Sequence, residues 1–232
     1  MIIVNEGQNL RVITQPDHAR FSGELLELWL LDALPNHPRR SDLLFAVREH
    51  DNGWREADAA PLVDPLTATP HDFLSFPEME RLEVWKRGID RYADTRAYSA
   101  LVILEHARVL HTASDDLWRA FLGELDAKRQ ELLDNLGLDE DQLKADYTYL
   151  RLTDKLSLTV CNKWLDRLRY AGVESQASED SITLDPFPLA GSTTFRIPCR
   201  YIPNRLYESD SDLGGELAAA RWNELEFRVR PA

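Results

Sequence analysis

Apolar residues recur at helical spacing through the larger part of the chain. Phe21, Leu25 and Trp29 mark one such stripe within residues 18–34. Leu43 and Val47 mark the next, which follows Ser41 and stops before an Asn-Gly pair at 52–53. Further stripes cover residues 77–93, 96–111, 114–136 and 139–169. A repeat of about 3.6 residues is typical of amphipathic helices, so these stretches predict a helical bundle.

The pattern changes after Gly172. The segments SITLDPFPL, TTFRIPCRYI and ELEFRVR alternate or are β-branched, with Pro and Gly between them, which indicates strands. The opening IIVNEGQNLRVIT predicts a short hairpin that turns at Glu6 and Gly7. The expected fold is therefore mainly α. A helical domain spans residues 1–172, and a small C-terminal antiparallel β appendage, residues 173–232, packs on it without being independent.

Composition limits the kinds of partner and the cellular compartment that we expect for this protein. The formal net charge of -13 over 232 residues disfavours a nucleic-acid partner, because an acidic surface repels phosphate backbones. No apolar run approaches the roughly 18 residues that a membrane span needs, and the N-terminal segment lacks the pattern of a signal peptide. The two cysteines, Cys161 and Cys199, are not spaced as CxxC. These features predict a cytoplasmic protein with neither nucleic acid nor membrane as a partner.

Five polar residues share faces with apolar stripes: His18, His50, Asp51, His106 and Asp154. A carboxylate buried in an apolar row must find hydrogen bonds, a cation, a metal or a proton. Imidazole and carboxylate groups on separate helices can surround one divalent ion. Each residue also has a simpler explanation, since a buried His can bond a carbonyl and an Asp can follow a helix end.

The simpler explanation for Asp154 is a salt bridge to Arg151 or Lys155. Taken together, however, the five residues favour a metal site. His111 is a less suitable ligand than His106, because the two lie five residues apart and so about 140° apart around a helix. The proline-rich segment between residues 52 and 77 predicts a pocket rim, with Trp54, His71 and Phe73 facing a substrate.

The ordered set of His18, the doublet His50-Asp51, and Asp154 within RLTDKLSL resembles the HD superfamily of metal-dependent phosphohydrolases. The segments TQPDHARFSGELLELW, REHDNGWREAD and LRLTDKLSLTVC, together with ITLDPFPL, resemble more closely a bacterial family catalogued as domain of unknown function 3891. The superfamily resemblance implies an HD-like helical bundle in which these four residues bind a divalent ion, with His106 as a further ligand.

The resemblance also implies a function, the hydrolysis of a small phosphorylated substrate. We expect one or two divalent ions (Mn, Fe, Zn, Ni or Mg), with Asp51 as the catalytic and, for two ions, the bridging carboxylate. No phosphate clamp is evident, and Lys155, Arg55 and Arg20 are candidates by proximity alone. Three alternatives stay open: an HD-fold di-iron oxygenase, a non-catalytic metal-binding or scaffold protein, and a protein without a metal whose polar residues form ordinary buried networks. The oligomeric state is not readable from the sequence.

Overall fold

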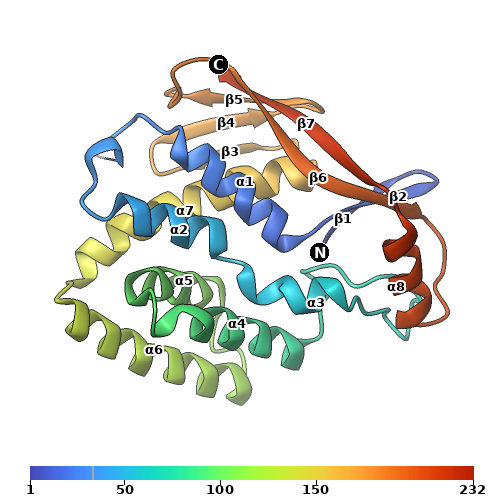
Figure 1. The fold of residues 1–232 in the computed structure, drawn as a ribbon, viewed down its shortest axis with the longest axis horizontal. Helices are drawn as coiled ribbons and strands as arrows, with labels where there is room; N and C mark the ends of the chain where they lie inside the picture. Colours follow the sequence, from blue (N-terminus) through green and yellow to red (C-terminus); the bar gives the residue numbers. More distant parts are fainter. Residues whose placement is uncertain (33) are drawn as a thin grey trace.

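The structure, a computed structural model, describes residues 1–32 and 34–232. Its elements form a layer of helices and a curled sheet that covers one side of that layer (Figure 1). The helices are α1 (Gln15–Glu27), α2 (Arg40–Glu49), α3 (Arg55–Ala59), α4 (Glu78–Ala93), α5 (Ala97–Leu110), α6 (Asp116–Leu136), α7 (Glu140–Cys161) and α8 (Asp210–Ala219), with 3-10 turns η1 (Leu34–Asn36) and η2 (Asn52–Trp54). The strands are β1 (Ile2–Glu6), β2 (Asn9–Ile13), β3 (Arg167–Tyr170), β4 (Val173–Ala177), β5 (Ser181–Asp185), β6 (Thr193–Pro203) and β7 (Trp222–Pro231).

The sheet has seven strands in the order β1-β2-β6-β7-β5-β4-β3. It is mixed, because β5 pairs with β7 in parallel while the other neighbours are antiparallel. The predicted N-terminal hairpin forms, with Gly7 at a φ of 78° in its turn, and it joins the sheet through β2 and β6. The expectation of a mainly α bundle with a small C-terminal antiparallel β appendage is therefore wrong. The boundary expected after residue 172 falls in the turn between β3 and β4.

Helix predictions hold where the apolar stripe packs on other helices. α4, α5 and α6 occupy nearly the stretches expected from their periodicity. The stripe of residues 18–34 overreaches, because α1 ends at Glu27, and residue 33 lies outside the described residues. The stripe of 139–169 also overreaches, since α7 ends at Cys161 and β3 follows it. Among the described residues, no helix has the length and apolar character that crossing a bilayer requires.

The core lies between the sheet and the helices. α1 and α7 run beneath the sheet, where α1 contacts β6 and α7 contacts β4 (Figure 1). Alternate side chains of β6 face this core, and the Phe195 ring meets the Phe21 ring of α1 at 5.2 Å between centroids. The buried guanidinium of Arg11 on β2 donates to the Cys161 carbonyl at 3.1 Å and so joins the sheet to the end of α7. Helices α1 and α7 are thereby fixed relative to each other.

The turn that follows α2 is held against α4. The amide nitrogen of Asn52 donates to the Glu49 carbonyl at 2.8 Å and to the Gly88 carbonyl at 2.9 Å. Arg91 donates back to the Asn52 carbonyl at 2.7 Å. Gly53 approaches α4 so closely that a Cβ there would lie 2.0 Å from the Val84 carbonyl oxygen. These contacts fix the backbone directly after His50 and Asp51.

We expect Gly53→Ala to destabilise the fold by about 1–3 kcal/mol, because the added methyl group overlaps the backbone of α4. Urea denaturation measures this change in the free energy of unfolding. Gly123→Ala is the matched control, since its Cβ on the exposed side of α6 meets nothing within 4 Å and alanine favours the helix by up to about 1 kcal/mol. Equal stability of the two variants would contradict the close packing of η2 on α4.

Candidate metal centre

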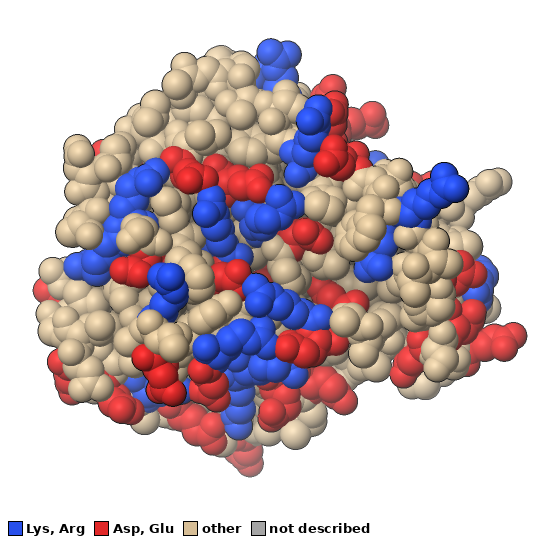
Figure 2. Space-filling model, viewed as in Figure 1, with Lys and Arg blue, Asp and Glu red and all other residues tan. Residues whose placement is uncertain are grey.

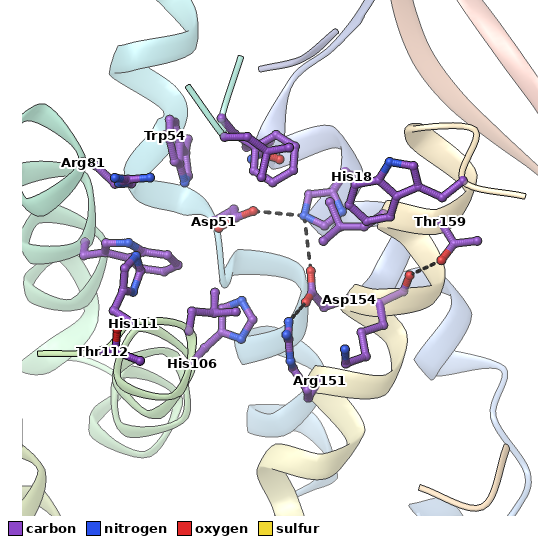
Figure 3. A pocket seen from close by; sticks show the side chains of 18 of the residues that line it. His18, Asp51, Trp54, Arg81, His106, His111, Thr112, Arg151, Asp154 and Thr159 are labelled. Carbon is purple, nitrogen blue, oxygen red and sulfur yellow. Dashed lines mark hydrogen bonds and ion pairs between the residues drawn. The ribbon is translucent and has the colours of Figure 1, made fainter. Parts of the chain in front are cut away.

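Four helical elements bring the five predicted metal ligands together, and Figure 3 labels His18, Asp51, His106 and Asp154. His18 projects from α1, His50 and Asp51 from the end of α2, His106 from α5 and Asp154 from α7. All five side chains are buried, with at most 6% of any residue exposed. Residues from widely separated parts of the sequence therefore form one polar cluster inside the helical layer.

The nitrogen and oxygen atoms of the cluster lie at short, similar separations. His18 Nε2 is 3.0 Å from Asp51 Oδ2 and 3.8 Å from Asp154 Oδ1. His50 Nε2 is 3.6 Å from each of these two oxygens. Ligand atoms that share an ion at about 2.1 Å lie about 3.0–3.4 Å from one another, so the spacing fits a divalent cation. Two overlapping groups could hold one: His18 with His50 and Asp51, and His50 with His106 and Asp154.

The outer ring nitrogens are held by groups outside the cluster. His50 Nδ1 donates to the Val47 carbonyl at 2.8 Å. In the neutral ring Nε2 therefore carries no hydrogen, and its lone pair is directed into the cluster. His18 Nδ1 contacts Ser157 Oγ, and that hydroxyl donates to the His18 carbonyl at 3.3 Å, so His18 Nδ1 is the donor. Ligating imidazoles in metalloproteins are commonly oriented in this way.

His50 Nε2 provides the test of whether a cation fits. This atom is buried and has no hydrogen-bond partner among the residues that the structure describes. Its neighbours Asp51 and Asp154 offer only acceptor oxygens when ionised, so a neutral His50 would direct its lone pair at two negative groups. A proton or a metal ion resolves this arrangement, and the His and Asp donors suit a divalent ion. The residues present therefore fit the expected metal.

Burial and the opposite charges within the cluster together shift the pKa values of its imidazole and carboxyl groups. Burial lowers the pKa of His50, but the charges of Asp51 and Asp154 outweigh burial and raise it to about 9. Burial would raise the pKa of both carboxyl groups, yet the neighbouring imidazoles, His50 foremost, hold both below their usual range. For His106 burial dominates and lowers the pKa to about 3. In the metal-free protein, a proton on His50 thus supplies the positive charge that the carboxylates require.

Asp154 forms a salt bridge with one carboxylate oxygen and directs the other into the cluster. Its Oδ2 accepts from Arg151 Nη1 at 2.6 Å, which is the salt bridge of the simpler explanation. Its Oδ1 faces His18 and His50 on the opposite side of the carboxyl group. The arginine therefore orients this carboxylate without using the oxygen that points into the cluster.

The cluster forms part of the wall of a pocket with a volume of about 550 Å³. Three residues that the sequence predicted to lie beside a substrate, Trp54, Phe73 and Lys155, line the pocket. His71 is not among the lining residues, and its ring lies 3.4 Å from Ser75 Oγ in the loop before α4. His111 lines the pocket but belongs to neither group that could hold a metal.

Several lining residues escaped prediction from the sequence. Arg81 and Trp85 of α4, Trp118 of α6 and Arg151 of α7 all border the pocket. A signal existed for Arg81, which lies four residues before the buried Trp85 and so shares its helix face. The candidates Arg20 and Arg55 are not among the lining residues; each pairs with a glutamate, Arg55 with Glu49 at 2.6 Å.

Comparison with known proteins assigns the chain to a family without assigning it a reaction. Neither a curated protein nor a solved structure matches the chain. A family model described as "Protein of unknown function (DUF3891)" matches residues 1–204, which include all five cluster residues and the strands as far as β6. The chain therefore belongs to the DUF3891 family.

Proposed function

We propose that the protein is a metal-dependent hydrolase of a small phosphate ester. The observation that carries this proposal is a buried His/Asp cluster that borders a pocket together with unneutralised basic side chains. The order of the cluster residues along the chain, which resembles that of HD phosphohydrolases, supports the same reaction class. The likeness to HD phosphohydrolases lies in the order of these residues along the chain. It does not extend to the whole architecture, because this chain also carries a seven-stranded sheet.

His18, His50, Asp51 and Asp154 would hold the ion, and His106 completes the set on the α5 side. A bound divalent ion supplies an electrophilic centre that acidifies water and polarises a phosphoryl oxygen. Asp51 is the proposed catalytic carboxylate, because it contacts both imidazoles nearest to it and also lines the pocket. Ser157 and the Val47 carbonyl keep the two imidazoles in the orientation that ligation needs.

Recognition of the phosphate is proposed for the α7 side of the pocket. Arg151 and Lys155 lie one turn apart on α7, and both line the cavity. Lys155 Nζ lies 5.5 Å from the centre of the Tyr170 ring and has no carboxylate partner among the described residues. Burial and the neighbouring Arg151 lower the pKa of Lys155. A phosphate beside the cluster would meet both cations.

We expect Asp154→Asn to lose bound metal, because the isosteric amide removes one of the two negative charges that attract a cation. Protein purified without chelator should hold on the order of tenfold less metal than the wild type by elemental analysis. Added Mn²⁺ should raise the melting temperature of the wild type but not of the variant. Asp141→Asn, an exposed site on the same helix, is the control. Equal metal content in the two variants would refute the proposed centre.

We expect Asp51→Ala to lower hydrolysis of p-nitrophenyl phosphate in the presence of Mn²⁺ by about 100-fold or more, because the substitution removes the carboxylate shared by the cluster and the pocket. Initial rates of nitrophenol release measure this loss. Asp94→Ala, at the exposed end of α4, should keep the wild-type rate. Unchanged activity in Asp51→Ala would exclude the mechanism, and turnover that requires oxygen and two irons would favour the oxygenase alternative.

A further inference from the structure

Two basic side chains of the pocket form no ion pair with any residue that the structure describes, in a protein whose basic residues are mostly paired with carboxylates. On the face drawn in Figure 2, Lys and Arg side chains lie next to Asp and Glu. Typical pairs are Arg55 with Glu49 at 2.6 Å and Lys128 with Asp90 at 2.5 Å. Within the described chain, neither Arg81 nor Lys155 forms an ion pair, although the net charge is -13. Both line the same cavity, which is where an anionic ligand would neutralise them.

Arg81 is surrounded by aromatic side chains. Its guanidinium carbon lies 5.6 Å from the centre of the Trp118 ring. Its Nε is buried and has no hydrogen-bond partner among the described residues. Glu78, the lining carboxylate one turn earlier on α4, instead accepts from the Trp118 indole N–H. No ion pair joins this carboxylate to Arg81 among the residues that the structure describes.

A second unpaired donor lies on the same wall. Trp85 follows Arg81 by one turn of α4, is only 5% exposed and lines the pocket. Its indole Nε1 is buried, and no described residue accepts its hydrogen. Buried donors without partners are costly, so two of them on one wall favour a bound acceptor. The wall formed by α4 thus offers an anion one positive charge and two buried hydrogen-bond donors.

This wall lies across the pocket from the basic residues of α7. In Figure 3, Arg81 and His111 stand on the side of α4 and α5, and Arg151 stands on the side of α7. Asp51 lies between the two sides, and Asp154 stands beside Arg151 on the side of α7. The region near Arg81 is lined by flat rings, and the His111 ring stacks on Trp118 at 4.3 Å with an interplanar angle of 9°. The basic side chains of the pocket thus stand on two different walls, with part of the cluster between them.

We propose that the substrate carries two anionic groups, with its phosphate at the cluster and a second acidic group, a carboxylate or another phosphate, at Arg81. This inference rests on the proposed hydrolase function. A flat apolar body joins the two groups and lies against the tryptophan rings. The class of ligand is therefore a small aromatic or similarly planar dianion, rather than a simple phosphate monoester.

Matched phosphonates, which are not hydrolysed, test the proposal by isothermal titration of the full Mn²⁺-loaded chain. Phenylphosphonate and biphenyl-4-ylphosphonate carry the first anion alone, whereas their carboxylated counterparts, 4-carboxyphenylphosphonate and 4'-carboxybiphenyl-4-ylphosphonate, add the second at two distances. We expect at least one carboxylated probe to bind the wild type about tenfold more tightly than its parent, as a charge-assisted bond to Arg would provide. In Arg81→Met this gain should disappear while phenylphosphonate binding persists.

Control variants and the unsubstituted probe distinguish failure of the second anion site from failure of the proposed hydrolase function. Arg81→Lys should retain part of the gain, and Arg119→Met, an exposed arginine on α6, should retain all of it. A gain of less than about twofold in the wild type, or a gain that survives in Arg81→Met, would overturn the second subsite alone. Failure of phenylphosphonate itself to bind the metal-loaded wild type would overturn the phosphate site and, with it, both proposals.

Discussion

Two ionised carboxylates in the protein interior impose the strongest constraint on this structure. Asp51 and Asp154 are 6% and 2% exposed, and an unpaired charge at such depth is costly. Three imidazoles and one guanidinium surround them, and each belongs to a helix that also supplies the core. The packing of α1, α2, α5 and α7 therefore brings partners to the buried carboxylates as well as burying apolar side chains. The same side chains could hold a divalent cation.

Rigid secondary structure, rather than loops, holds the side chains of the cluster. Only the His50-Asp51 doublet lies beyond the end of a helix, and its backbone is secured by Asn52 and Gly53 against α4. The same helix presents Arg81 and Trp85 to the pocket. Helix α4 thus supports the His50-Asp51 doublet on one part of its surface and borders the pocket with another. A change in its position would alter both at once.

The sequence allowed the cluster to be predicted because the relevant signal is local. Each ligand lies on an apolar stripe, and a polar residue on a buried face can be recognised within one or two helical turns. The sheet could not be predicted in the same way. The pairing of Leu10 with Ile202, and of β5 with β7 in parallel, depends on contacts between distant segments that no short pattern encodes. Long basic side chains such as Arg81 are equally ambiguous, since on a helix they usually extend into solvent.

The position of β7 has a consequence for how the sheet comes together. This strand lies between β6 and β5, although it follows every other strand in sequence. Without residues 222–231, β1, β2 and β6 would be one three-stranded piece, unpaired with the other, which is β5, β4 and β3. The segment that unites them lies beyond residue 204, where the match to the family ends. All five residues of the cluster precede β3, so they stand well before the strand that completes the sheet.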